Sequence, residues 1–451
     1  MLIKLPSNVE EFVDTKKSIA SCEMVIDYAK KLGATDVSVN LDKGLGLSVT
    51  VRENELETLE FDNDAGLDIT LYYGTKKASA STSVLTEKNI KHTIETTLAV
   101  AKKMQEDDCA GLADASLMSK NHLELDLYQP SKLSIEECIE LAKECEEAGL
   151  SSSDKIINTE GASIICSQDF SVWANSNGFI GYYPTSESFI SCHLVAGYKE
   201  QMEADIYYDL GINDNCLSDV KRIGKLAASR AVARLNAQKI DTCDAPVLFV
   251  PDTAKSLFKC FMAGISGGKV WRRSSFLMDR VGDKIFSDSV NIREEPHILG
   301  SLYSAPFDLE GVATYAKDFV KDGILEQYLL SSYSARKLNL KTTANSGGMH
   351  NLIVSHSDKT YKDLIKEMDT GLIVTEFLGD GSNLVTGDYS RGVAGFWVEA
   401  GEIKYPVSEV TIAGNLIDMY KNIVAIGNDV DNRSIVKTGS VLIESMKIAG
   451  N

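Results

Sequence analysis

Residues 252–268 read Asp252-Thr-Ala-Lys-Ser-Leu-Phe258-Lys259-Cys-Phe-Met-Ala263-Gly264-Ile-Ser266-Gly267-Gly268. The sequence predicts one helix here, capped by an Asp at its start and ended by glycines. A helix that binds zinc needs two imidazoles one turn apart and a carboxylate that activates the bound water. The stretch contains neither His nor Glu, so this helix cannot carry such a site.

Six sequence blocks begin at the end of this helix and continue to near the C-terminus. They are Gly267-Gly268-Lys269-Val270, Asp322-Gly323-Ile324-Leu325, Ser332-Tyr333-Ser334-Ala335-Arg336-Lys337-Leu338, Gly387-Asp388-Tyr389-Ser390-Arg391-Gly392, Ile412-Ala413-Gly414-Asn415-Leu416 and Gly427-Asn428-Asp429. In this order and register they resemble the PmbA/TldD family, and within it the PmbA branch, also called TldE. The resemblance implies that the chain shares the fold of TldD, the partner with which TldE pairs as an intracellular metalloprotease.

The resemblance also implies which residues replace a zinc site. TldD carries His-Glu-x-x-x-His on the corresponding helix, and here Phe258, Lys259 and Ala263 stand at the first His, the Glu and the second His. The third zinc ligand of TldD, a cysteine near the C-terminus, falls at about Thr438. None of these four residues binds zinc in the usual way. The resemblance therefore implies no metal and no cofactor in this chain, with zinc held by the partner subunit.

By this resemblance we expect a TldE-like subunit of a TldD/TldE-type complex, a subunit that is not catalytic alone. It would pair with a TldD-like zinc peptidase subunit and complete or close the chamber around the active site of that partner. Only unfolded peptides would enter, bound in extended form against strand edges. The family is also linked to peptide maturation and to an old label as modulators of DNA gyrase. The acidic composition predicts that any connection to gyrase is indirect.

Candidate residues for a peptide cleft lie in two of these blocks and directly before the first of them. They are Ser266, Gly267, Asp388 and Arg391. The block 387–392 brackets Asp388 and Arg391 between two glycines and leads into the apolar strand 393–398. Two interpretations stay open for this block, a turn locked by an Asp–Arg ion pair and a lining of the cleft that holds a substrate or partner.

A second hypothesis makes the chain itself a hydrolase that acts through Ser266 and Lys269. Residues 264–268 match Gly-x-Ser-x-Gly, but a nucleophile elbow needs a strand before the serine and a helix after it, and here a helix comes first. Ser266 and Lys269 also form Ser-x-x-Lys, which residues 420–422 and 437–439 extend into an imitation of the penicillin-binding signature. A third hypothesis is a homodimeric peptide-binding protein without a catalytic partner.

The histidines offer no predicted metal site. His350 and His356 lie six residues apart near Asp358, and Glu294, Glu295 and His297 form a second loose group. No two histidines are spaced one helical turn apart, so we expect solvated or hydrogen-bonded side chains.

Composition limits the possible partners and the compartment. The 451 residues carry a net charge of −19, which argues against nucleic acid and against an anionic membrane surface. Nine cysteines without a Cys-x-x-Cys pair are typical of reduced thiols. The N-terminus lacks the apolar core of a signal peptide, and nowhere are about 18 apolar residues consecutive. We therefore expect a cytoplasmic protein.

The pattern of apolar residues predicts an α+β fold in two parts. Residues 1–222 are expected to form a mixed sheet with covering helices, with a possible sub-boundary at the polar linker 105–120. Residues 223–451 are expected to form a mostly antiparallel β domain with a few helices. A basic amphipathic helix, 217–237, would be the hinge between the two. Further predictions in the first part are five short strands between residues 36 and 85, a capping box at 134–137 and an Asn-Gly hairpin turn at 175–178.

Overall fold

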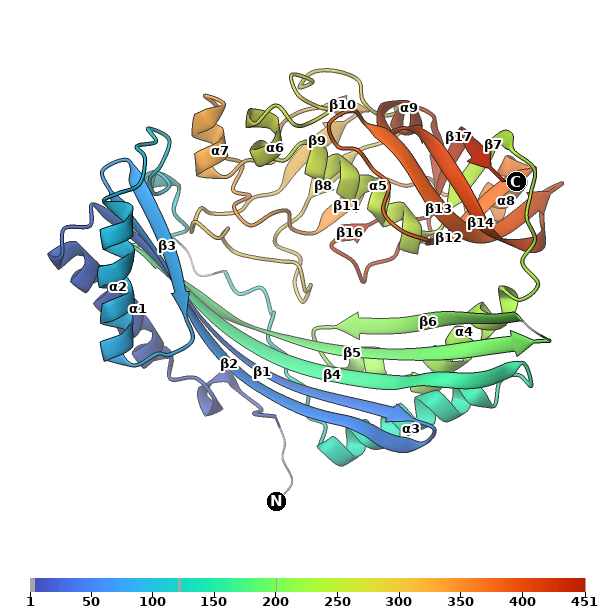
Figure 1. The fold of residues 1–451 in the computed structure, drawn as a ribbon, viewed down its shortest axis with the longest axis horizontal. Coiled ribbons are helices and arrows are strands. Elements are labelled where there is room, and N and C mark those ends of the chain that lie inside the picture. Colours follow the sequence, from blue (N-terminus) through green and yellow to red (C-terminus); the bar gives the residue numbers. More distant parts are fainter. Residues whose placement is uncertain (1–4, 121–122, 200, 451) are drawn as a thin grey trace.

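The computed structural model describes residues 5–120, 123–199 and 201–450. Its N-terminal half is one antiparallel sheet with the strand order β3-β2-β1-β4-β5-β6, and this sheet curves beneath the rest of the molecule (Figure 1). Buried and more exposed residues alternate along its strands, as expected of a sheet that is covered on one face. The strand bounds are β1 Asp36–Arg52, β2 Glu55–Tyr73, β3 Lys76–Thr82, β4 Ile156–Asn175, β5 Ile180–Tyr198 and β6 Gln201–Gly211.

Four helices cover one face of the sheet in two pairs. α1 (Thr15–Lys31) and α2 (Glu87–Ala101) pack on one end, whereas α3 (Ile135–Leu150) and α4 (Val220–Ala233) pack on the other. Each pair buries its own apolar cluster against the strands. The predicted capping box is present at the start of α3. The α+β class, with helices that cover a largely antiparallel sheet, is confirmed.

The strands are longer than the sequence suggested. Instead of five short strands between residues 36 and 85, the structure has three, because the predicted breaks continue as strand. Gly44 and Gly46 pair in register with Asp64 and Asp62. Residues that favour turns in isolation are thus held in the sheet by neighbouring strands. The Asn-Gly turn was predicted correctly, since it joins β4 to β5 with Gly178 at φ +86°.

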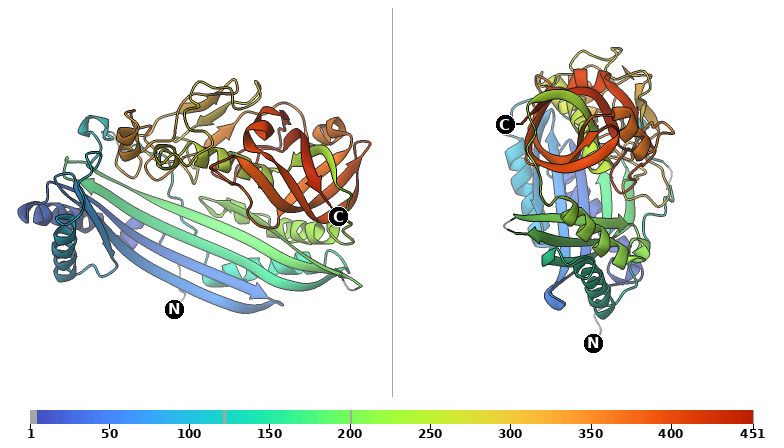
Figure 2. Two further views of the ribbon diagram at one scale, coloured as in Figure 1. Left: turned by 45° about the horizontal axis from the view of Figure 1, so that its top comes forward. Right: turned by 90° about the vertical axis from the view of Figure 1, so that its right-hand side faces the viewer.

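The C-terminal half contains two further sheets. One has the order β10-β9-β8-β11-β16, and the other has the order β14-β13-β12-β7-β17-β15. Because β14 also pairs with β17, the second sheet closes into a barrel that is seen end-on in the right view of Figure 2. The strand bounds are β7 Cys243–Phe249, β8 Ile292–Glu294, β9 Lys317–Lys321, β10 Ile324–Leu325, β11 Leu352–Val354, β12 Gly371–Phe377, β13 Asp388–Glu399, β14 Glu402–Asn415, β15 Ile423–Ile426, β16 Val436–Lys437 and β17 Val441–Ala449.

Helices pack on both sides of the barrel strands. α5 shares the main core with one face of β7 and β12, and α8 packs against residues of the opposite face, such as Leu248 and Ile373. Pairing is mostly antiparallel, with β7–β12 and β11–β16 parallel. Among the described residues no helix is long and apolar enough to cross a membrane. The helices are α5 Pro251–Gly264, α6 Gly267–Trp271, α7 Ser332–Lys337, α8 Tyr361–Met368 and α9 Leu416–Lys421.

The predicted hinge helix is shorter than expected. It corresponds to α4, which packs against α3, β5 and β6 and therefore follows the N-terminal sheet. A short 3₁₀ turn, Asp214–Leu217, precedes it, and Asp219 caps its first turn. The division of the chain at residue 222 stays a prediction.

The linker 105–120 is fixed onto the C-terminal half by α7. Arg336 donates hydrogen bonds to the backbone carbonyls of Cys109, Gly111 and Leu112, at 2.7, 2.7 and 3.0 Å. Lys337 pairs with Asp107 at 2.7 Å, and hydrogen bonds from Lys337 and Tyr333 lower the pKa of Asp107 to about 2. A segment that looked like a free linker is therefore one of the joints between the two halves.

Arg336→Ala should loosen this joint. Three charge-assisted hydrogen bonds are lost at once, so we expect the free energy of unfolding to fall by about 2 kcal/mol and amide exchange at residues 109–112 to accelerate. Hydrogen–deuterium exchange with urea unfolding measures both effects. Lys341→Ala, at an exposed position beyond α7, is the matched control. Unchanged exchange at 109–112 in Arg336→Ala would contradict the assignment.

Candidate functional site

Helix α5 begins two residues earlier than the sequence suggested and without the predicted Asp cap. Val250 occupies the N-cap position without a side-chain hydrogen bond, and Pro251 begins the helix. Proline suits this first position because its missing N–H would have no helical partner there. Asp252 lies in the first turn, and its carboxylate instead binds Arg230 of the N-terminal half and Lys255 of its own helix.

Phe258, which the resemblance places at the first zinc-binding His of TldD, lies in the core. Its ring is 0% exposed and stacks on Phe286, with centroids 6.3 Å apart and planes at 16°. Phe286 in turn stacks on Tyr420 at 4.4 Å, and the Tyr420 hydroxyl donates to the carbonyl of Leu257 at 2.8 Å. The face of α5 that holds Phe258 is thus closed by aromatic packing.

The other three positions that the resemblance identifies hold Lys259, Ala263 and Thr438. Lys259 is exposed and Ala263 is partly buried, while desolvation, followed by the neighbouring Lys255, lowers the pKa of Lys259. Thr438 is buried directly after β16, a strand that packs on α5, and its hydroxyl donates to the carbonyl of Gly439 at 3.1 Å. These residues do not fit a zinc ion. Across residues 5–120, 123–199 and 201–450, no three His, Cys, Asp or Glu side chains gather to hold a metal.

Ser266 and Gly267 form the junction between α5 and α6. Gly267 donates to the carbonyl of Leu329 at 2.8 Å, and a Cβ added to it would lie 2.4 Å from Oγ of Ser334. Only glycine therefore allows α6 and α7 to approach this closely. Ser266 is preceded by a helix, so the strand that a nucleophile elbow requires is absent at this position.

The predicted ion pair between Asp388 and Arg391 is wrong. Both lie at the start of β13, but Arg391 donates to the carbonyl of Gly379 at 3.1 and 2.9 Å and stacks over Phe377 at 3.8 Å. Asp388 instead accepts from the Thr386 hydroxyl at 2.7 Å. Residues three apart on a strand point to opposite faces, which is why the pair does not form. Asp388 lines an open cavity of about 440 Å³ with residues 380–383 and Ser390.

The loosely grouped histidines are held by protein partners. His297 Nε2 hydrogen bonds to the Thr314 hydroxyl at 2.9 Å, and His350 Nδ1 lies 3.4 Å from the buried Glu294 carboxylate. Glu294 also forms a buried ion pair with Lys317. The ring of His356 contacts the carbonyl of Ser357 at 2.9 Å.

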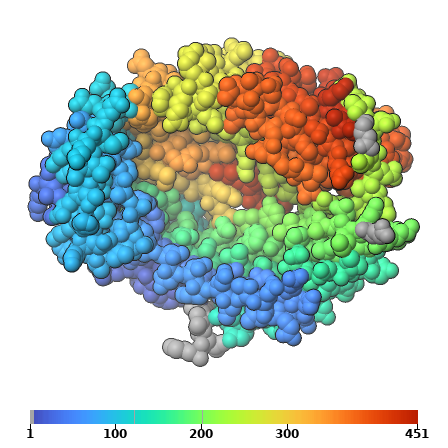
Figure 3. Space-filling view, viewed as in Figure 1, coloured from blue at the N-terminus to red at the C-terminus, as the bar shows by residue number. Residues whose placement is uncertain are grey.

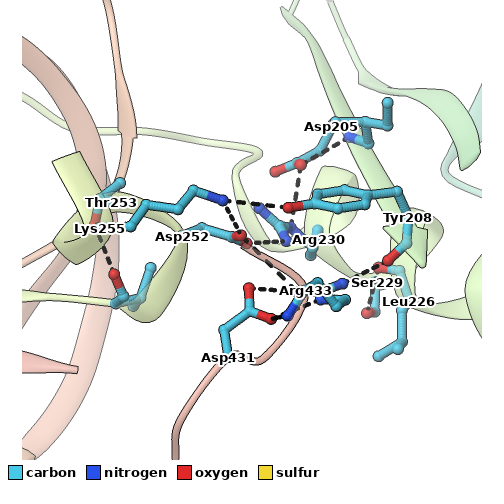
Figure 4. Close-up of polar contacts among 12 residues, drawn as sticks. Asp205, Tyr208, Leu226, Ser229, Arg230, Asp252, Thr253, Lys255, Asp431 and Arg433 are labelled. Atoms are coloured by element: carbon cyan, nitrogen blue, oxygen red, sulfur yellow. Dashed lines mark hydrogen bonds and ion pairs between the residues drawn. The ribbon is translucent and has the colours of Figure 1, made fainter. Parts of the chain in front are cut away.

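Sequence reasoning missed a large charged cavity where the two halves meet. It has a volume of about 890 Å³, and Figure 4 shows its polar contacts. The basic character of the predicted helix 217–237 was the one available signal, because three of its arginines line the cavity. The charged lining residues are Asp205, Arg222, Arg230, Arg234, Asp252, Asp429, Asp431 and Arg433.

Asp252 is the centre of the charge network in this cavity. It accepts from Arg230 of α4 at 3.2 Å and from Lys255 at 3.3 Å, and it lies 3.9 Å from Arg433. Arg230 also pairs with Asp205 of β6 at 3.1 Å. The network therefore links β6 and α4 of the N-terminal half to α5 of the C-terminal half (Figure 4).

Arg433 ties a third segment into the same network. Its guanidinium binds Asp431 at 2.9 and 3.0 Å, lies 4.6 Å from the centroid of the Tyr208 ring and donates to the Tyr208 carbonyl. Burial raises the pKa of Asp431, but the hydrogen bonds and charge of Arg433 outweigh it and keep this pKa below its ordinary value. Asp431 is therefore ionised, and its charge helps to hold the junction.

Comparisons with known proteins give a consistent result. Residues 37–101, 128–235 and 242–450 match, in order, domain 1, the central domain and the C-terminal domain of the PmbA/TldA metallopeptidases. The metalloprotease PmbA of Escherichia coli O157:H7 is 44% identical over 451 residues, 100% of this chain and 99% of that protein.

Solved structures agree with these matches. A protein of Bacteroides thetaiotaomicron that is named as a modulator of DNA gyrase superposes with a TM-score of 0.92 at 28% identity, covering 97% of this chain and 100% of that one. TldE of Thermococcus kodakarensis has a TM-score of 0.84 at 19% identity, covering 95% and 100%, and this last likeness is one of fold alone.

Phe258→Ala should destabilise the protein strongly. Removal of a fully buried ring from an aromatic stack leaves a cavity, and we expect a loss of about 3 to 5 kcal/mol in the free energy of unfolding. The matched control is the adjacent Lys259→Ala, which should change it by less than about 0.5 kcal/mol because Lys259 is exposed. Urea unfolding of both variants measures the difference. Equal effects would show that Phe258 is not a core residue.

Arg433→Met should change how stability depends on pH. Because the pKa of Asp431 is lowered in the folded protein, its charge stabilises the fold above about pH 4, and this contribution is lost as the pH falls through the folded pKa. Without Arg433, the variant should be less stable by about 2 kcal/mol at pH 7 and should lose less stability on acidification.

Unfolding by urea between pH 3 and pH 7 gives both quantities. The control is Arg222→Met, because Arg222 lines the same cavity and forms no ion pair within the part of the chain that the structure describes. A loss of stability on acidification that is equal in Arg433→Met and in the wild type would refute the electrostatic role of Arg433.

Proposed function

This chain belongs to the PmbA/TldD family and is PmbA-like, and from that membership we propose that it is the subunit without a zinc centre in a two-chain metalloprotease. The observation that carries the proposal is the position of Phe258. At the place where the catalytic subunit of the family has its first zinc-binding His, this chain has a wholly buried ring within an aromatic stack. A metal ligand needs lone-pair electrons and room for the ion, and this environment offers neither.

The partner is a TldD-like subunit that supplies the zinc ion and performs the hydrolysis. Our chain contributes the wall of a chamber, and the hollow between its two halves in Figure 3 has the form that this role requires. Unfolded peptides are the substrates, since a closed chamber admits an extended chain more readily than a folded domain. Asp388 and Arg391 beside the cavity at residues 380–383, with Ser266 and Gly267 at the end of α5, are our candidates for the peptide cleft.

We place this complex in the cytoplasm. All nine cysteines are free thiols, and free thiols are the usual state of cysteine in a reducing compartment. Their burial supports the same assignment, since Cys22, Cys138, Cys145, Cys166 and Cys192 fill apolar positions as small hydrophobic residues.

The proposal predicts that activity requires mixing. The isolated chain should hold less than about 0.1 zinc per chain and should leave unfolded peptides intact, because zinc-dependent hydrolysis needs three protein ligands and an open position. Addition of the homologous chain with His-Glu-x-x-x-His from the same cell should produce a complex of both chains that holds zinc and cleaves peptides. Metal analysis, native mass measurement and a peptide digest test the three parts.

A partner whose first motif His is replaced by Ala is the control, and its mixture should stay inactive. One tightly bound zinc per isolated chain would refute the proposal, as would peptide turnover without the partner. A homodimer that forms no complex with the partner would instead support a peptide-binding protein without catalytic activity.

A further inference from the structure

Strand β2 has a long free edge. Its neighbour β3 pairs only with residues 67–73, whereas β1 pairs with β2 along its whole length. Between residues 55 and 66 the outer side of β2 has no strand partner in the described part of the chain. Backbone N–H and C=O groups on such an edge are a template for another strand. This segment contains neither Lys nor Pro, two residues that commonly protect free edges from pairing.

One side of this edge is apolar and uncovered. Leu56, Leu59 and Phe61 are 43, 46 and 48% exposed. In the register of the sheet Leu59 is opposite Val49 and Phe61 is opposite Leu47, and both of these β1 residues are buried in the cluster beneath α3. The apolar layer of the sheet therefore continues past the cover of α3 and ends at the free edge.

The opposite side of the same edge is acidic. Asp62 and Asp64 line a cavity of about 290 Å³ together with Asp42 and Asp169 of the neighbouring strands, and Lys43 is the single basic residue in this lining. Glycines form its floor, and a Cβ added to Gly44 would lie 2.9 Å from the Asp169 carboxylate. Burial, followed by repulsion from Asp42, raises the pKa of Asp169. A cation placed here would relieve this repulsion.

We propose that the β2 edge, residues 55–66, is where the partner subunit docks, by adding a strand in which apolar side chains alternate with basic ones. The inference rests on the proposed function, because it names the surface that the partner covers. Successive side chains of an added strand point to opposite faces. One set would therefore lie against Leu59 and Phe61, and the other would lie over the acidic cavity.

The negative charge of the edge favours a basic strand of the partner over a second copy of this chain. The segment 55–66 carries five acidic residues and no basic one, so two such edges would bring like charges together across the ladder. A basic strand on a different subunit is complementary. The position also suits the proposed chamber, since the N-terminal strands form the lower rim of the hollow in Figure 3, and a strand added there extends its wall. The twelve residues span about 40 Å, enough for a stable ladder.

The test uses full-length chain mixed with the cognate His-Glu-x-x-x-His subunit. Asp62→Lys with Asp64→Lys should weaken the complex by roughly tenfold or more, as should Leu59→Ser with Phe61→Ser. The matched control is Glu23→Lys with Asp27→Lys, which makes the same change in charge at exposed positions of α1 and should leave the dissociation constant within about twofold. Circular dichroism and thermal unfolding confirm that each variant folds.

Hydrogen–deuterium exchange provides a direct readout of strand addition. Amides in 55–66 should become protected when the wild-type chain binds its partner. If the wild-type complex forms and the edge variants bind equally well, this inference falls while the proposed function stands. If the edge variants bind the partner normally but raise the KM for peptides, the edge holds substrate, and the assignment to the partner is overturned. If the wild-type chain forms no complex, the proposed function falls, and this inference with it.

Discussion

The contacts between the two halves, the ion pairs around Asp252 among them, are the constraint on which the shape of this protein depends. The curved sheet and the barrel have separate cores, so the angle between the halves is set where side chains cross from one to the other, through these ion pairs and through an aromatic cluster in which Phe307 packs on Trp173 and Phe179. Arg230 and Arg433 converge on Asp252 from α4 and from the segment after β15. At the other end of the molecule, Arg336 holds the linker by its carbonyls. Together with this aromatic cluster, two polar joints thus keep a hollow open between the two halves. Joints of this kind are directional, and each lost partner would leave a partly buried charge unpaired.

The same constraint determines the two structural roles of α5. Its first turn must present Asp252 to the N-terminal half, and its middle must fill the core between the sheets. A helix with an inward-facing aromatic ring at residue 258 satisfies both demands. A metal centre there would instead require polar ligands and a route for water in place of the stack formed by Phe258, Phe286 and Tyr420. In this chain the middle of α5 is therefore part of the core, and Phe258 contributes to its packing.

The sequence predicted the class of the fold and its hairpins because local signals determine them. The capping box of α3 and the Asn-Gly turn before β5 depend only on neighbouring residues, and both are present. The length of β1 and β2 could not be predicted, since Gly44 and Asp64 stay in the sheet only through cross-strand pairing. The Asp388–Arg391 pair was inferred from closeness in sequence, but strand geometry separates the two side chains. The cavity between the halves joins residues more than 200 positions apart, Asp205 and Arg433 among them, and no local pattern indicates such a contact.

Charge connects the composition of the chain to its assembly. A net charge of −19 argues against nucleic acid as a ligand. It does not disfavour every partner, because the acidic groups are not spread evenly. At the β2 edge these acidic groups lie beside unpaired backbone N–H and C=O groups and exposed apolar side chains. Exposure of such a surface to water is unfavourable unless another chain covers it. Like charges would discourage two copies from pairing there, so under our proposal the acidic edge would protect the free chain from self-association. Binding of a subunit that carries both the zinc ligands and a basic strand would then extend the sheet and supply the zinc site at the same time. Assembly and activity would be coupled through that strand, with no need for a separate switch.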